Sequence, residues 1–210
     1  LVIKFAQRLG EAAARGGAKA TDPLKAKFGI DVSGRVEESI QTLLWSFQSG
    51  AMAGLDATSD GDRWEWLHKA VVLASGATGG FVGLPGLLWD LPITTGAIMR
   101  SVADIARSFP GEDISNDDTK RSCIEVLAAG SPLAEDDEAE LGYWAARTGL
   151  THTTVELAIK AISARFGVVI SEKILAQAVP VVGAVAGAGL NYVFIDYYQE
   201  MARVQFMIRA

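Results

Sequence analysis

The run AVVLASGATGGFVGLPGLLW, residues Ala70–Trp89, contains five glycines and no charged side chain. A second uncharged run, ILAQAVPVVGAVAGAGLNYVFI, covers Ile174–Ile195 and lies between Lys173 and Asp196. As a helix, each run would be long enough to cross the apolar core of a bilayer, which is about 30 Å thick. The glycines and Pro85 make a straight helix costly in the first run, so simple spanning is not its only interpretation.

Small residues repeat at four-residue spacing in both runs, at Gly79 and Gly83 and again at Gly183 and Gly187. This spacing lets two helix backbones approach closely. We therefore expect the two runs to pack against each other as a buried pair at the centre of a helical bundle. Two further interpretations stay open, a re-entrant or monotopic membrane insertion and true bilayer-spanning helices. Asp90 argues against bilayer-spanning helices, because it lies where a spanning helix has Lys or Arg anchors.

The rest of the chain follows helical periodicity, and no segment alternates with the period of a strand. Proline and glycine pairs such as Pro85-Gly86 and Pro110-Gly111 punctuate the pattern. The sequence therefore predicts an all-α, single-domain helical bundle. Its predicted helices cover about residues 1–19, 34–57, 62–78, 92–109, 115–130, 134–148, 151–178 and 181–209.

Composition excludes several classes of protein. The chain has 210 residues, of which 50% are hydrophobic, with one cysteine and a net charge of −6. Disorder, a disulfide framework, a cysteine-based zinc site and general nucleic-acid binding are all excluded on these grounds. Residues 1–35 carry a net charge of +4, which suits either an anionic membrane surface or the solvated face of a helix. We expect residues 1–34 to form a basic helix and linker and residues 35–210 to form the helical domain.

Motifs for catalysis or metal binding are absent from the sequence, including His-Glu-x-x-His, Gly-x-Ser-x-Gly and the phosphate-binding loop. His68 follows Glu65 at a spacing used in carboxylate-bridged metal sites, but those sites use two such pairs. We therefore expect no metal and no other cofactor. Cys123 is most simply a small core residue, with a Cys123–His152 dyad as the open alternative.

Ionisable and hydrogen-bonding residues inside apolar surroundings make up the candidate ligand-binding site, namely Asp90, Arg100, Asp104, Asn191, Asp196 and Tyr197. A structural interpretation pairs Asp90 with Arg100 and fixes the register of the helices. It likewise pairs Asp196 with Arg203. A functional interpretation gives the same groups to a polar head group at the mouth of an apolar pocket. A third assigns paired carboxylates to acid–base catalysis.

Two blocks of sequence resemble the EcsC protein family. The first block comprises Gly79–Pro92 and Met99–Ala106, and the second comprises Val179–Tyr192 and Asp196–Ala202. The likeness covers roughly residues 35–209. It implies a helical bacterial protein on the cytoplasmic side of the membrane, in a family named for a protein encoded beside an ABC transporter. The family has no agreed active site, although some members carry hydrolase or peptidase labels.

The chain departs from the family pattern at Phe109-Pro110-Gly111, where a proline separates the aromatic residue from the glycine. We expect a non-enzymatic protein, cytoplasmic and peripherally associated with the inner membrane. It would bind a lipid or other amphiphile, or dock to a membrane partner such as a transporter or secretion component. One alternative is a hydrolase that uses Asp90, Asp104, Asp196 and a tyrosine. The other is a pure scaffold.

Overall fold

The computed structural model describes residues 32–50, 65–82, 84–127, 154–160, 162–163 and 183–210. These residues form helices and turns and contain no strand, so the predicted all-α bundle is confirmed. The labelled helices are α2 (Val32–Gln48), α3 (Glu65–Val82), α4 (Leu84–Arg107), α5 (Asp117–Val126) and α8 (Gly183–Arg209). Residues 155–160 form a further short helical segment.

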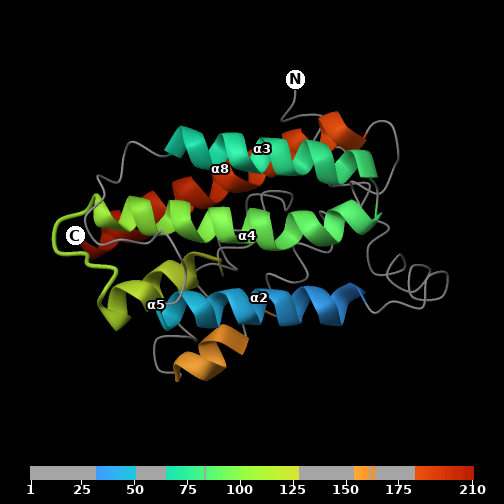
Figure 1. Cartoon of the computed structure of the whole chain (residues 1–210). Helices are drawn as coiled ribbons and strands as arrows, with labels where there is room; N and C mark the ends of the chain where they lie inside the picture. The colour runs from blue at the N-terminus through green and yellow to red at the C-terminus, as the bar shows by residue number, and fades with distance from the viewer. Residues whose placement is uncertain (1–31, 51–64, 83, 128–153, 161, 164–182) are drawn as a thin grey trace, which may run out of the picture.

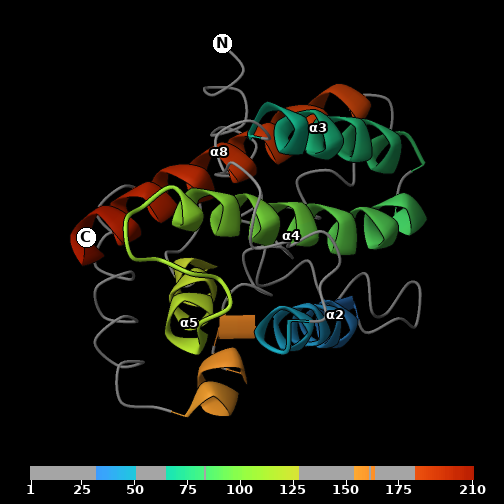
Figure 2. The ribbon, with the colours of Figure 1, turned by 60° about the vertical axis from the view of Figure 1, so that its left-hand side comes forward.

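The helices lie in layers, with α4 in the middle (Figure 1). Helices α3 and α8 pack against each other and together cover one side of α4. Helices α2 and α5 pack on the other side of α4, and the segment 155–160 lies beyond them (Figure 2). The two glycine-rich runs thus meet through α3 and α8, as predicted, and the close approach that the structure describes is between Gly76 and Gly187.

The predicted helix 92–109 begins too late, because α4 already starts at Leu84. Pro85 lies in the first turn, where its missing N–H has no intrahelical partner to lose. Pro92 lies inside α4, which continues through it. The Pro85-Gly86 pair therefore marks the start of a helix rather than a break before one, and Asp90 becomes part of α4.

The hydrophobic core lies between α4 and the helices on both sides of it. Its fully buried large side chains come from four helices: Ile40, Leu44 and Phe47 on α2, Ile98 and Met99 on α4, Ile124 on α5, and Phe194, Tyr198 and Phe206 on α8. Burying each such side chain contributes about 1.5–3 kcal/mol. The core therefore binds the α3–α8 layer and the α2–α5 layer to the same central helix.

The helix ends follow local chemistry. Helix α2 stops at Gln48 rather than near residue 57, and Gly50 next to it adopts a positive φ of 73°. Helix α5 begins after Asn116, whose side chain accepts a hydrogen bond from the Asp118 N–H. Asp117 and Asp118 in the first turn complement the helix dipole. The predicted helix 115–130 is therefore confirmed, with its start at Asp117.

Some predicted elements fall on residues beyond those described. They comprise the helices at 1–19 and 134–148, most of 151–178, and residues 20–31 of the predicted linker, whereas residues 32–34 belong to α2. Among the helices that the structure describes, none has both the length and the hydropathy needed to cross a membrane.

Candidate functional site

A buried polar network joins α3, α4 and α8, with the carboxylate of Asp90 at its centre. Ser75 on α3 donates to Asp90 Oδ1 at 2.5 Å, and Thr94, one turn along α4, donates to the same oxygen at 2.9 Å. Asn191 on α8 donates from Nδ2 to Asp90 Oδ1 at 3.1 Å. Asp90 is only 3% exposed and Asn191 is fully buried. These hydrogen bonds let α4 hold a polar group inside an apolar layer.

Close backbone approach is what allows Asn191 to reach this network. Its Nδ2 also donates to the Val72 carbonyl of α3 at 2.8 Å. A Cβ atom added to Gly76 would lie 2.5 Å from the Gly187 carbonyl oxygen and 2.5 Å from Asn191 Nδ2. No side chain larger than hydrogen fits there, so Gly76 is the α3 residue that sets the α3–α8 separation.

A second polar cluster joins the start of α3 to the end of α4. His68 Nε2 lies 2.7 Å from Asp104 Oδ2, and because a carboxylate only accepts, this ring nitrogen carries the donated proton. Arg107 pairs with the other oxygen of Asp104. All three side chains are largely buried.

A third polar cluster lies at the surface, between α3 and α8. Lys69 Nζ is 2.7 Å from Asp196 Oδ1 and 5.3 Å from the centre of the Tyr192 ring. The side chain of Asp196 is 45% exposed, and Tyr192 is 38% exposed. This cluster therefore faces solvent, unlike the other two.

The directions of the helices follow from these contacts. Along α3, Lys69 lies beside Asp196, while Gly76, further on, lies beside Gly187. Residue numbers rise on α3 as they fall on α8, so the two helices run antiparallel (Figure 1).

A comparison with protein families gives one match, in which the EcsC protein family covers residues 61–210. The chain belongs to the EcsC protein family. The comparisons with curated proteins and with solved structures give no match. All of α3, α4, α5 and α8 lie within the region that matches the EcsC family, so the three polar clusters do as well.

Asp90 and Asn191 are the two predicted site residues that the structure joins directly. The predicted Asp90–Arg100 pair is wrong, because both residues lie on the continuous helix α4. Ten residues of helix separate them by about 15 Å, beyond the reach of an ion pair. Asp104 contacts His68 instead, in a separate cluster.

The predicted Asp196–Arg203 pair is also wrong. Asp196 contacts Lys69 on α3, whereas Arg203 contacts Glu200 on its own helix at 2.6 Å. Tyr197, the last of the predicted residues, packs edge-on against Tyr198 with ring centres 5.2 Å apart.

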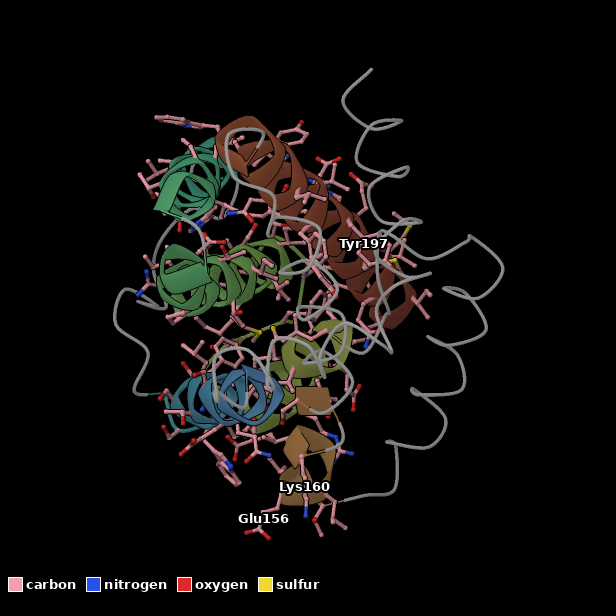
Figure 3. All side chains as sticks on the ribbon, turned by 90° about the vertical axis from the view of Figure 1, so that its right-hand side faces the viewer. Glu156, Lys160 and Tyr197 are labelled. Atoms are coloured by element: carbon pink, nitrogen blue, oxygen red, sulfur yellow. The ribbon has the colours of Figure 1, made fainter. Side chains whose placement is uncertain are left out.

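Figure 3 shows Tyr197 on α8, far from Glu156 and Lys160 on the segment 155–160. Asp90 and Asn191 meet in the buried network, whereas Asp104 lies in the His68 cluster and Asp196 lies at the surface, so the six predicted site residues do not form one site.

Sequence reasoning missed Ser75, Thr94 and Lys69 as members of these clusters. Thr94 follows Asp90 by four residues, a spacing that brings side chains together once the helix is known to include both. Ser75 and Lys69 find their partners 15 and 127 residues away, so no local spacing reveals them. His68 pairs with Asp104, 36 residues away.

The chemistry available to the described residues is limited. No group of three or more His, Cys, Asp or Glu side chains suited to a metal ion lies among them. Burial raises the pKa of the Cys123 thiol, which keeps it protonated and unreactive. Asp90 and Asp104 stand fourteen residues apart on α4, about 21 Å along its axis. Paired catalytic carboxylates lie about 5–10 Å apart, so these two do not share a site.

Proposed function

We propose that this protein is a peripheral membrane protein that binds the lipid surface through the outer side of the α3–α8 layer. The observation that carries the proposal is the α3 outer face, defined as Trp66, Ala70, Val71 and Ala74. Trp66 is 68% exposed and Val71 is 44% exposed. Ala70 and Ala74 continue the exposed row at four-residue spacing.

The α3 outer face is apolar, and the exposed row ends at the polar side chain of Thr78. Between Ala70 and Val82 the helix has no charged side chain on any face. A soluble helix ordinarily presents charged residues to water on its exposed side. An exposed tryptophan beside such a row is typical of surfaces that enter the boundary between head groups and acyl chains.

The charge of the sequence also suits an anionic lipid surface. Lys69 lies one turn from Trp66 and adds a cation at the edge of the α3 outer face. Residues 1–35 carry a net charge of +4 on a chain whose total is −6. Basic residues near an anionic leaflet contribute about 1 kcal/mol each. Membership of the EcsC family fits a position on the cytoplasmic side of the inner membrane, which forms part of this proposal.

The buried networks belong to the fold in this proposal. Asp90 and Asp104 hold α3 and α8 against α4 and leave the outer side of the layer to face the membrane. Lipid is bound on the surface and not between the helices.

Vesicle flotation tests the proposal. The full chain is expected to float with vesicles that contain anionic phosphatidylglycerol and to lose part of that binding in high salt. Trp66→Ala should weaken binding by about 10- to 100-fold, because a large apolar side chain that enters lipid contributes about 1.5–3 kcal/mol.

Trp45→Ala is the matched control, since Trp45 is 43% exposed on α2 in the opposite layer. It should leave flotation unchanged. Absence of flotation on every vesicle composition would contradict the proposal and leave docking to a membrane protein, or a scaffold role, as the explanation of the exposed face. An equal loss of vesicle binding in both tryptophan variants would indicate that the lipid contact does not lie on α3.

A further inference from the structure

We infer that the cluster of Lys69, Tyr192 and Asp196, called here the headgroup triad, recognises a lipid head group that carries both a phosphate and a primary ammonium. This inference rests on the proposed function and names the lipid class: phosphatidylethanolamine. The triad lies next to Trp66, at the edge of the α3 outer face.

The triad already contains a site for an ammonium group. The Lys69 ammonium lies over the Tyr192 ring at 5.3 Å and contacts the Asp196 carboxylate at 2.7 Å. An aromatic face together with a carboxylate is the combination that binds an organic cation. Tyr192 and the carboxylate of Asp196 are both accessible from solvent. A cation from outside can therefore reach the position that Lys69 occupies.

The phosphatidylethanolamine head group fits the headgroup triad through an exchange of ion-pair partners. The ethanolamine ammonium can take the place of Lys69 beside Tyr192 and Asp196, while Lys69 turns to the phosphate of the same head group. The Lys69–Asp196 ion pair is broken, and two ion pairs are formed, one at Asp196 and one at Lys69. The exchange keeps every charge of the triad paired.

The other common head groups fit less well. Phosphatidylglycerol supplies a phosphate but no cation, so drawing Lys69 away would leave Asp196 uncompensated at a negative surface. A choline group can lie over Tyr192, but it has no N–H to donate to the carboxylate. A primary ammonium has three N–H donors. The triad therefore favours ethanolamine over both.

The experiment compares two sets of vesicles with the same anionic fraction, the remainder being either phosphatidylethanolamine or phosphatidylcholine. The wild-type chain is expected to bind the first set about three- to fivefold more tightly, the ratio that one additional exposed ion pair supplies. Asp196→Asn should abolish this preference and retain binding to both sets. Tyr192→Leu, which removes the ring but no charge, should reduce the preference as well.

Glu200→Gln is the matched control, because Glu200 is an exposed acid one turn further along α8 and is paired with Arg203. It should keep the preference intact. Thermal unfolding of each variant establishes that it is folded.

Wild-type binding that is equal on both sets would overturn the headgroup inference and leave the proposed function standing. Absence of binding to either set would overturn both. Soluble phosphoethanolamine in excess should not displace the protein from vesicles, because it lacks the acyl chains that Trp66 contacts. Binding of soluble phosphoethanolamine to the chain without vesicles, together with equal binding to both sets of vesicles, would assign the triad to free phosphoethanolamine and not to a lipid.

Discussion

The Asp90 network and the headgroup triad both link α3 to α8, but they differ in burial and in partners. Asp90 is 3% exposed and is held by hydroxyl and amide donors from three helices. The side chain of Asp196 is 45% exposed and is held by the ammonium group of Lys69. One carboxylate is fixed by its surroundings, and the other can change its partner.

This difference separates the structural side of the α3–α8 layer from its binding side. A buried carboxylate that loses a donor has no water to replace it, so the loss appears as lower stability. An exposed carboxylate exchanges protein partners for water or ligand at little cost. Substitutions at the two places should therefore differ in size and in their response to salt.

The largest effect is expected where the buried network needs close helix approach. Gly76→Ala should lower the free energy of unfolding by about 2–4 kcal/mol. The added Cβ would lie 2.5 Å from the Gly187 carbonyl oxygen, a backbone atom that cannot move without shifting α8. Urea unfolding followed by circular dichroism measures the change.

Gly96→Ala provides the control for this prediction. Gly96 lies in α4, and a Cβ added there meets nothing within 4 Å. The same substitution should raise stability by about 0.5–1 kcal/mol, because alanine is the better helix former. Equal effects at the two glycines would mean that α3 and α8 do not approach closely at Gly76.

The next effect concerns Asp90 itself. Ser75, Thr94 and Asn191 all donate to Asp90 Oδ1, which the amide oxygen of Asp90→Asn can replace. The new amide nitrogen then takes the place of Oδ2, 3.4 Å from Asn191 Nδ2, so two buried donors face each other and the charge that the donors stabilise is lost. The expected loss of stability is about 1–3 kcal/mol. Thermal or urea unfolding of the variant at neutral pH gives the value.

Double-mutant cycles identify the partner of Asp90. Asp90→Asn with Asn191→Ala should give a coupling energy above about 0.5 kcal/mol, because the two side chains are 3.1 Å apart. Asp90→Asn with Arg100→Met should give less, because about 15 Å of helix separates those residues. A larger coupling energy for Asp90 with Arg100 than for Asp90 with Asn191 would support the ion pair expected from sequence.

The helices of this fold could be predicted where local chemistry determines them. The helix that begins near residue 115 and the long helix α8 follow directly from residue order, although the N-cap is Asn116. The start of α4 could not be predicted in this way, because a proline such as Pro85 is equally compatible with a helix break and with the first turn of a helix. Placing Asp90 outside the helix then led to the wrong partner, Arg100.

The candidate site was less accessible to prediction than the fold. Asp90 and Asn191 stand out because they are polar residues within apolar runs, and they do meet. Their partners Ser75 and Lys69 belong to α3, and only the antiparallel packing of α3 on α4 and α8 determines which residues they face. Long-range register of this kind depends on the packing of whole helices and is not encoded in any short motif.

The smallest effect is expected in the headgroup triad. Lys69→Met and Asp196→Asn should show a coupling energy of about 0.2–1 kcal/mol in low salt, the range for exposed ion pairs. In about 1 M salt the screening length falls to about 3 Å, so the coupling should approach zero, whereas the Asp90–Asn191 coupling should persist because water and ions do not reach it. Unfolding experiments at both salt concentrations measure the two couplings side by side. A Lys69–Asp196 coupling energy above about 2 kcal/mol that salt does not reduce would identify the pair as a structural ion pair that stabilises the fold. Lys69 could then not leave Asp196 for a phosphate, and the exchange on which headgroup recognition depends would not occur.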